Sequence, residues 1–319
     1  MTRKISIGSD PEFGITDKDG ILVPANKIFG GCGECNPCDG CNRTKCTIDY
    51  SGCGACDGCE YTPGSNHCNY CDPCCECDSC REEVGDCDFC ADCRDNMDLE
   101  CAEIGCDGNN DIGELRPRYS KTPNDHHDNI KDLIGAIDIP SKYEIRAGTN
   151  VDGRSIGGHI HIGGYEKEKY NETFFKDLSN YMSRYVGMPL RMIEHPEDLE
   201  KRGYPDYGFG QFGQHHCTNY GIEWRMPASW LVSSDIALSA LCLARIVAGE
   251  YDINPQKIII PKIIVQRKTI ESKFVAPRMI GKIEKMQDYS KYSKELQPLF
   301  ELLIEGKKWK TDIDIRNTW

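Results

Sequence analysis

The segment between residues 31 and 106 contains nineteen of the chain's 21 cysteines and very few large apolar side chains. Most of these cysteines stand three residues apart, in runs separated by Gly, Asp, Asn, Pro and Glu. A segment of this composition buries too little apolar surface to offset the conformational entropy that it loses on folding. We therefore expect bound metal ions or disulfides to hold it together.

The cysteine spacing favours zinc, because two thiolates three residues apart can chelate one tetrahedral ion. The cysteines that follow this spacing, and that we predict to bind Zn²⁺, are Cys32, Cys35, Cys38, Cys41, Cys53, Cys56, Cys59, Cys68, Cys71, Cys74, Cys77, Cys80, Cys87, Cys90 and Cys93. Disulfides and an iron–sulfur cluster are the alternatives. Disulfides need an oxidising compartment, and an iron–sulfur cluster needs more apolar cover than this segment offers.

The acidity of the chain belongs to the same segment. Residues 31–106 carry 17 acidic and 4 basic side chains, a difference equal to the whole net charge of −13. So acidic a segment is a poor ligand for phosphate backbones, which argues against nucleic acid as a partner. The chain has no apolar run of about 18 residues that would span a membrane. Its N-terminus lacks the apolar core of a signal peptide, so we expect a cytoplasmic protein.

The remaining sequence predicts an α+β domain with an antiparallel sheet and helices packed on one side. A hairpin is expected at about residues 3–30, with an Asp-Gly turn at Asp19 and Gly20. A hairpin needs further strands to bury its apolar face. The next candidates follow the cysteine-rich segment, at 112–116, 143–146, 159–162 and 221–225. We therefore predict one catalytic domain formed by residues 1–30 and 107–319, interrupted by a metal-binding insert at 31–106.

Apolar spacing predicts helices between these strands. They are expected at 125–137, at 173–185, from a cap at Ser233 or Ser234 to about 248, and once or twice within 281–305. Cys217 and Cys242, which lie outside the insert, are expected to be small buried side chains.

Titratable side chains recur two residues apart on the predicted strands. The pairs are Asp10 and Glu12, Glu114 and Arg116, His159 and His161, and Glu223 and Arg225. Side chains two apart on a strand point to the same face. One such pair alone is more often an exposed pair or an ordinary core histidine, but four in one chain favour a shared site.

The residue types in these pairs indicate a chemistry. Clustered carboxylates need compensating cations, and oxygen ligands suit Mg²⁺ or Mn²⁺. Arginines grip phosphate oxygens in a fork. Metal ions and arginines around a phosphate describe a phosphoryl-transfer site.

At these residues the chain resembles the glutamine-synthetase-like superfamily, and within it the phage-type amidoligases. The matching pieces, in the family's order, are Gly8-Ser9-Asp10-Pro11-Glu12-Phe13, Asp107-Gly108 leading to Glu114-Leu115-Arg116-Pro117, Gly157-Gly158-His159-Ile160-His161-Ile162-Gly163, and Gly221-Ile222-Glu223-Trp224-Arg225. The resemblance covers roughly residues 4–30 and 104–250. If a phage encodes the chain, the cytoplasm is that of its host cell.

The resemblance implies a ligase that uses ATP and Mg²⁺ to join a carboxylate to an amine through an acyl phosphate. It implies metal ligation by Asp10, Glu12, Glu114, His159 and Glu223. It places Arg225 and Arg116 at ATP phosphates or a substrate carboxylate, and His161 beside the substrate. Small molecules or peptides would supply the carboxylate and the amine, and a homo-oligomer is compatible with this reading.

The chain departs from the family pattern before Glu223. An arginine is expected after a Tyr-Gly stretch there, but Tyr207-Gly208 is followed by no arginine before Arg225. Arg202 is a possible substitute, or the substrate differs from the family's. His215 and His216 either replace the missing cation or are loop residues, and the second reading is favoured. Residues 251–319 match nothing that the resemblance explains.

Two other functions stay open on the sequence. A guanidino or carboxylate kinase of the same fold would stop at phosphorylation, and a non-catalytic scaffold would only display the zinc-binding insert. The insert itself is either a stapled loop that stabilises or dimerises the enzyme, or a lid that docks a substrate.

Overall fold

The computed structural model describes residues 5–29, 104–107, 111–166, 169, 171–199, 210–218, 220–256 and 272–319. The fifteen predicted zinc ligands, and Arg202 and Tyr207, lie outside the described residues. The chain divides into two units, one formed by Met1–Val23 and Glu114–Trp319 and the other by Pro24–Gly113. The domain boundaries and the zinc site therefore stay predictions.

The first unit is built on a sheet in which β4, β1, β8, β10 and β9 are neighbours in that order. Their bounds are β1 (Ser6–Thr16), β4 (Gly113–Leu115, the last two residues in this unit), β8 (Gly158–Gly163), β9 (His215–Thr218) and β10 (Gly221–Trp224). The pairs β1–β8, β8–β10 and β10–β9 are antiparallel. The predicted α+β class with an antiparallel sheet is confirmed.

Strand β1 changes partners along its length. Its first half pairs with β8, while its last residues pair antiparallel with β2 (Leu22–Val23) and β5 (Glu144–Arg146). The β1–β2 turn is the predicted hairpin, closed by Asp17, whose carboxylate accepts from the backbone N–H groups of Asp19 and Ile21. Gly20 takes the positive φ of 82° that this turn requires.

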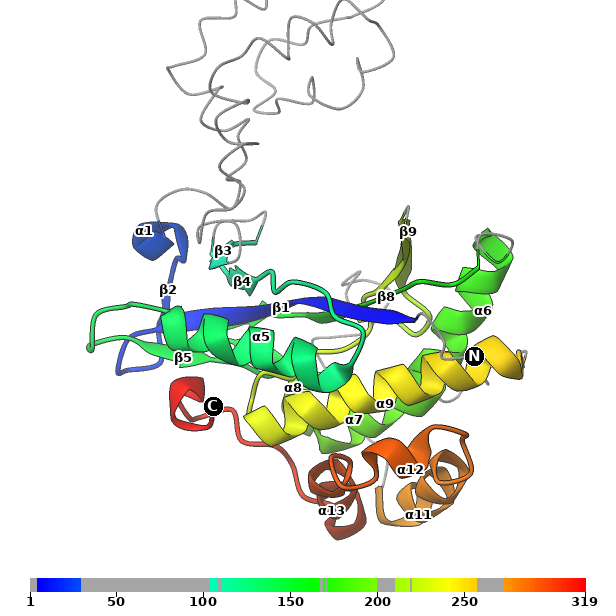
Figure 1. Ribbon diagram of the computed structural model, residues 1–319. Coiled ribbons are helices and arrows are strands. Elements are labelled where there is room, and N and C mark those ends of the chain that lie inside the picture. The colour runs from blue at the N-terminus through cyan, green and yellow to red at the C-terminus, as the bar shows by residue number, and fades with distance from the viewer. Residues whose placement is uncertain are drawn as a thin grey trace, which may run out of the picture. The chain divides into compact units, whose positions relative to one another are not determined.

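Most helices of the first unit lie on one side of this sheet, with α5 and α9 nearest to it and α11, α12 and α13 farther away, whereas one end of α6 rises past the sheet beside β9 (Figure 1). Their bounds are α5 (Pro123–Ala136), α6 (Glu172–Met182), α7 (Met188–Ile193), α8 (Pro196–Leu199), α9 (Ser234–Ile253), α11 (Ser272–Ile283), α12 (Tyr289–Tyr292), α13 (Gln297–Glu305) and the 3₁₀ helix η8 (Ile315–Asn317). The predicted cap Ser233 is confirmed, since its hydroxyl accepts from the Ile236 N–H.

The sequence missed three local features. The helix expected at 173–185 is α6 followed by a π-helical turn, η7 (Ser183–Gly187), and α7. The irregular turn coincides with three hydrogen bonds of the Ser183 hydroxyl. It donates to the Ser179 carbonyl and accepts from the Gly213 N–H and the Trp224 indole N–H. A small hairpin of β6 (Asn150–Val151) and β7 (Arg154–Ser155) and strand β9 were also not expected.

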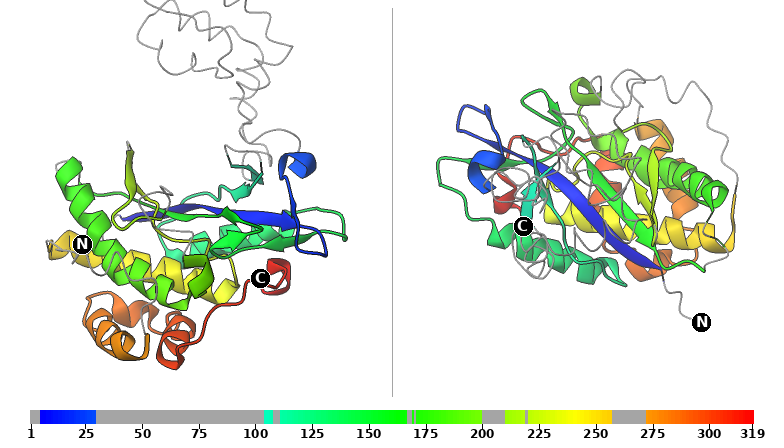
Figure 2. Two further views of the ribbon diagram at one scale, coloured as in Figure 1. Left: turned by 180° about the vertical axis from the view of Figure 1, so that it is seen from behind. Right: turned by 90° about the horizontal axis from the view of Figure 1, so that it is seen from above.

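Alternating residues separate the two faces of the sheet. The side chains that face the helices are fully buried and form the core: Ile7, Phe13, Ile15, Ile160, Ile162, Ile222 and Trp224. Seen from above, β1 lies in front of α9 (Figure 2). Residues one position away on β1, β8 and β10 therefore point to the opposite face.

The second unit is described only in part. It contains α1 (Asn26–Phe29) and β3 (Ile104–Cys106). The Ala25 N–H donates to the Asp111 carbonyl at 3.1 Å, and the Asp107 N–H to the Ile112 carbonyl at 2.8 Å.

Over the described residues of the whole chain, no helix combines the length and apolarity that crossing a membrane requires.

Candidate active site

The sheet register brings the predicted histidines and carboxylates together. His159 lies opposite Asp10, and His161 lies between Gly8 on β1 and Glu223 on β10. All of these side chains lie on the face away from the helices, because they alternate with the core residues. Segments that are about 150 and 210 residues apart in sequence therefore meet as one cluster.

The distances within the cluster are short. His161 Nε2 lies 3.2 Å from Asp10 Oδ1. His159 Nδ1 lies 3.4 Å from both Asp10 Oδ1 and Glu223 Oε1. His159 Nε2 lies 4.0 Å from Glu12 Oε1. His159 therefore lies within 4.0 Å of three carboxylates, Asp10, Glu12 and Glu223.

The two histidines favour the ionised form of Asp10. Burial alone would raise the pKa of Asp10, but contact with His159 and His161 outweighs it and holds that pKa well below its usual range. Burial alone would lower the pKa of His159, and the neighbouring Asp10 and Glu12 reverse this and raise it. The cluster thus keeps Asp10 ionised in a largely buried position.

Three residues of the cluster fit a metal ion. Asp10, His161 and Glu223 each offer a ligand atom, and the three atoms lie within 4.8 Å of one another. Asp10 Oδ1 and His161 Nε2 are buried and contact each other at 3.2 Å, but within the described residues neither atom forms a hydrogen bond of suitable geometry. Buried polar atoms in this state are costly, and a coordinated cation would satisfy both.

This group shares Asp10 and Glu223 with the predicted ligand set and adds His161, which the prediction placed beside the substrate. It does not include the other three predicted ligands, Glu12, Glu114 and His159. His159 still lies within 3.4 Å of two of the same carboxylates. Glu12 has one oxygen occupied by the Gly157 N–H at 2.5 Å. Glu114 lines the adjacent cavity with Asp10.

Each predicted arginine is held by the glutamate two residues before it. Arg225 Nε lies 3.0 Å from Glu223 Oε1, and Arg116 Nη2 donates to Glu114 Oε2 at 2.8 Å. The two arginine side chains remain 41% and 35% exposed. Their guanidinium groups are therefore oriented by the protein while part of each faces solvent, where it can meet an anion.

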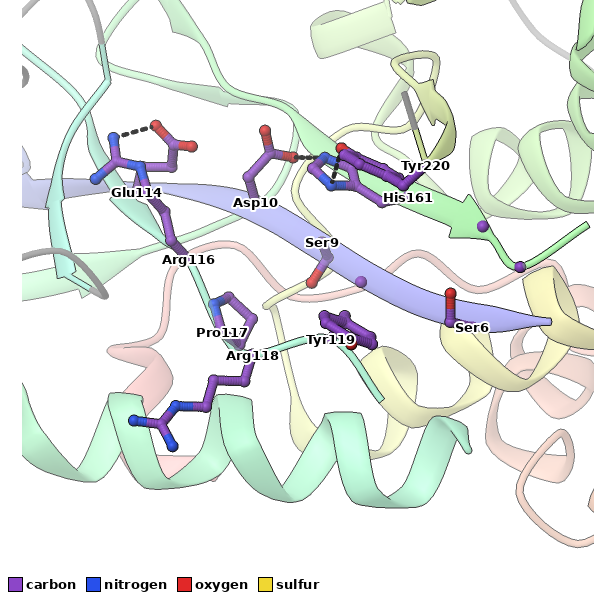
Figure 3. Close-up of a pocket in the computed structure, with 13 residues that line it drawn as sticks. Ser6, Ser9, Asp10, Glu114, Arg116, Pro117, Arg118, Tyr119, His161 and Tyr220 are labelled. Carbon is purple, nitrogen blue, oxygen red and sulfur yellow. Dashed lines mark hydrogen bonds and ion pairs between the residues drawn. The ribbon is translucent and has the colours of Figure 1, made fainter. Parts of the chain in front are cut away.

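A cavity of about 690 Å³ opens beside Asp10 and His161. Figure 3 shows Asp10 and the Glu114–Arg116 pair at one end, and Tyr119, Tyr220 and Ser6 toward the other. A cavity of this size accommodates a small-molecule ligand.

The two glycines before His159 are required by close approaches. A Cβ on Gly157 would lie 2.6 Å from His159 Nε2, and one on Gly158 would lie 2.5 Å from the Ala228 carbonyl oxygen. Any side chain at Gly157 would therefore displace the histidine at the centre of the cluster.

Sequence reasoning missed two partners of the site. The Tyr220 hydroxyl bonds His161 Nδ1 at 3.0 Å, and the two rings stack. Beneath the sheet, His126 of α5 bonds the Ser9 hydroxyl at 2.8 Å and the Arg118 carbonyl at 2.9 Å. Only the pairing of strands and helices reveals these contacts, although Tyr220 does adjoin the Gly221–Trp224 strand.

Two further expectations are wrong. His215 and His216 are not loop residues but part of β9, where His216 pairs with Glu223. Cys217 is exposed rather than buried, because β9 ends the strand order of the sheet; Cys242, within α9, is buried as expected.

Comparison with known protein families identifies a relationship. A family model described as phage phiEco32-like COOH.NH2 ligase-type 2 matches residues 97–319. The match includes β8, β10 and residues 251–319, which the sequence analysis left without interpretation, whereas β1 with Asp10 and Glu12 lies outside the matched range. None of the curated proteins compared matches the chain.

Proposed function

Because the chain belongs to the phage phiEco32-like COOH-NH2 ligase type 2 family, we propose that it joins a carboxylate to an amine in a reaction that consumes ATP and needs Mg²⁺ or Mn²⁺. In the first step a carboxylate oxygen of the substrate attacks the γ-phosphorus of ATP, ADP leaves, and an acyl phosphate forms. In the second step the amine nitrogen attacks the acyl carbon, phosphate leaves with the bridging oxygen, and the nitrogen loses a proton.

The observation that carries this proposal is the convergence of Asp10, His161 and Glu223 on one point, with ligand atoms within 4.8 Å. Two carboxylates suit Mg²⁺ and Mn²⁺, and an imidazole ligand favours Mn²⁺. A bound ion would supply charge neutralisation on the phosphoryl oxygens. His159 would hold Asp10 and Glu223 in place through its two 3.4 Å contacts.

The arginines take the anionic parts of the substrates. Arg225 would bind phosphoryl oxygens beside Glu223, and Arg116 would bind a phosphate or the substrate carboxylate at the cavity. Their glutamate partners keep both guanidinium groups oriented before substrate arrives, which lowers the entropy cost of binding.

Isotope transfer tests the acyl phosphate. The enzyme is incubated with ATP, Mg²⁺, an amine pool and cell extract, and mass spectrometry identifies the condensed product that has lost one water. The carboxylate substrate is then labelled with ¹⁸O. We expect one ¹⁸O atom in the released phosphate for each amide formed, and amide formation without that transfer would contradict the mechanism.

The same experiment separates the kinase alternative. A kinase would accumulate a phosphorylated product and form no amide. Replacing Glu223 by Gln should abolish both phosphate release and amide formation, because both proposed steps use the same cluster.

We also retain zinc binding by the cysteines of residues 31–106 as a proposal, supported by their Cys-x-x-Cys spacing. Native mass spectrometry of the full chain should count bound zinc ions, and removal by a chelator should release them. A mass equal to that of the metal-free, disulfide-bonded chain would contradict zinc binding.

A further inference from the structure

One end of the cavity is built around Gly8, on the same face of the sheet as Asp10. The antiparallel bridge between Ile7 and Ser120 places Tyr119 beside Gly8 on one side. The β1–β8 register places His161 beside it on the other. A Cβ on Gly8 would lie 3.4 Å from Tyr119 Cβ and 3.5 Å from His161 Cβ. Gly8 therefore forms a gap between two ring-bearing residues.

The next row of the sheet is more tightly filled. Ser6 lies opposite Gly163, and both line the cavity. A Cβ on Gly163 would lie 2.7 Å from the Tyr220 carbonyl oxygen, so that position must stay small. The floor of this end of the cavity thus consists of backbone and one small hydroxyl side chain.

Two tyrosines border this floor. Tyr119 is 76% exposed and Tyr220 is 45% exposed, and both line the cavity. Tyr220 stacks on His161 with ring centroids 5.8 Å apart and an angle of 27° between the rings. Neighbouring strands are about 4.8 Å apart, so roughly 10 Å separates the backbones that carry Tyr119 and His161. A flat ring between two side chains needs about 3.5 Å of contact distance on each side, about 7 Å in all, which is less than this backbone spacing.

We propose that this floor and its two tyrosines form a slot for a planar aromatic ring of the ligand, whose charged end lies at Asp10, Glu114 and Arg116. Aromatic rings pack well against tyrosine faces, and glycine leaves flat peptide groups open to them. The ring belongs either to the base of the nucleotide or to a side chain of the acid or amine substrate. The slot rests on the proposed function for the orientation of the charged end and for the nucleotide, acid or amine as the source of the ring.

Binding of matched probe pairs tests the slot without any turnover. The pairs are ATP against inorganic triphosphate, and phenylalanine against alanine, so that the members of a pair differ by the ring-bearing part. Saturation-transfer NMR and calorimetry on the full chain with Mg²⁺ measure which pair the protein distinguishes. We expect one ring-bearing probe to bind at least about 10-fold more tightly than its partner, and the pair concerned identifies the source of the ring.

Variants then locate the effect. Gly8→Ala adds a methyl group at ordinary contact distance, so it should fold with an unchanged melting temperature and weaken the ring-bearing probe about 10-fold or more. Tyr119→Ala should weaken it similarly, whereas Tyr119→Phe, which keeps the ring, should bind as the parent does.

The slot is overturned if no ring-bearing probe binds more tightly than its partner. It is also overturned if Gly8→Ala and Tyr119→Ala leave the difference unchanged. Amide formation by the parent enzyme together with either result would leave the ligase proposal intact. Ring binding without amide formation would support the slot and reject the ligase.

Discussion

The two faces of the central sheet use the same three strands for different purposes. On β8, Ile160 points to the helices and is fully buried, while its neighbours His159 and His161 point to the acidic cluster. On β10, Trp224 packs into the core while Glu223 contacts His159. The period of two in a strand thus places stability and chemistry in adjacent residues. Substitutions one residue apart should therefore affect different properties.

The largest effect is expected from Glu223→Gln on the acidic face. The change keeps the size of the side chain but removes the charge that contacts His159 and Arg225 and that would bind the metal. We expect the rate of amide formation to fall at least about 10³-fold, with little loss of stability. Mass spectrometry of the product measures the rate, and thermal melting measures the stability.

Glu305→Gln on α13 is the matched control, because it removes a half-exposed carboxylate that lies on a helix outside the cluster. It should leave the rate unchanged. A Glu223→Gln enzyme that keeps more than about a tenth of the parent's activity would contradict the assignment of the cluster.

The next effect tests the opposite face. Ile160→Ala removes a fully buried side chain between the sheet and the helices. The free energy of unfolding should fall by about 3 to 4 kcal/mol, from lost burial and the cavity left behind. Urea denaturation measures this loss, and the folded fraction should keep its activity. Ile304→Ala, at a site 57% exposed, should change stability by less than about 0.5 kcal/mol.

A third test uses acid. Burial lowers the pKa of His126 from 6.5 to about 4, against the raising effect of the Arg118 carbonyl. Between pH 6.5 and about 4, His126 is therefore protonated in the unfolded chain but neutral in the folded chain, so stability falls as the pH falls. The contribution of neutral His126 to the free energy of unfolding is fully present above pH 6.5. About 3 kcal/mol should be lost as the pH falls from 6.5 to about 4.

His126→Gln removes this titration. Urea denaturation at several pH values should then show a flatter dependence of stability on pH between 6.5 and 4 than in the parent. Burial also lowers the pKa of His127. Since His127 is present in both proteins, its titration contributes to both slopes, and the difference between the slopes reports His126. Equal slopes for parent and variant would mean that His126 is not held neutral beneath the sheet.

The smallest effect is expected from Tyr220→Phe. The variant keeps the ring beside His161 but loses the 3.0 Å hydrogen bond to Nδ1. One hydrogen bond of about 1 kcal/mol corresponds to a loss of roughly 5-fold in kcat/KM, with stability nearly unchanged. Steady-state kinetics measure it, and an unchanged kcat/KM would show that this bond does not position His161.

The sequence predicted the charged cluster because its signal is local. Asp10, His159 and Glu223 each stand beside a second titratable residue at the spacing of a strand face, and such residues rarely serve a core. It did not predict the ring-bearing gap at Gly8, because that gap depends on which strands pair and in which register. Nor did it identify His126, since a histidine on a helix gives no sign of the Ser9 hydroxyl and Arg118 carbonyl that it contacts. Ser183 likewise looked like an ordinary helical residue, although three bonding partners distort its turn.

The most direct test of the metal cluster is Mn²⁺ binding followed by electron paramagnetic resonance in the parent and in Asp10→Asn with Glu223→Gln. Thiolates are poor ligands for Mn²⁺, so the cysteine-rich segment should contribute little to the signal. We predict that the parent binds Mn²⁺ and that ATP increases its affinity for the ion. The double variant, which thermal melting should show to be folded, should bind at least one ion fewer. Equal numbers of bound ions in the two proteins would contradict the central claim that distant acidic and imidazole side chains meet on this sheet to hold a divalent cation.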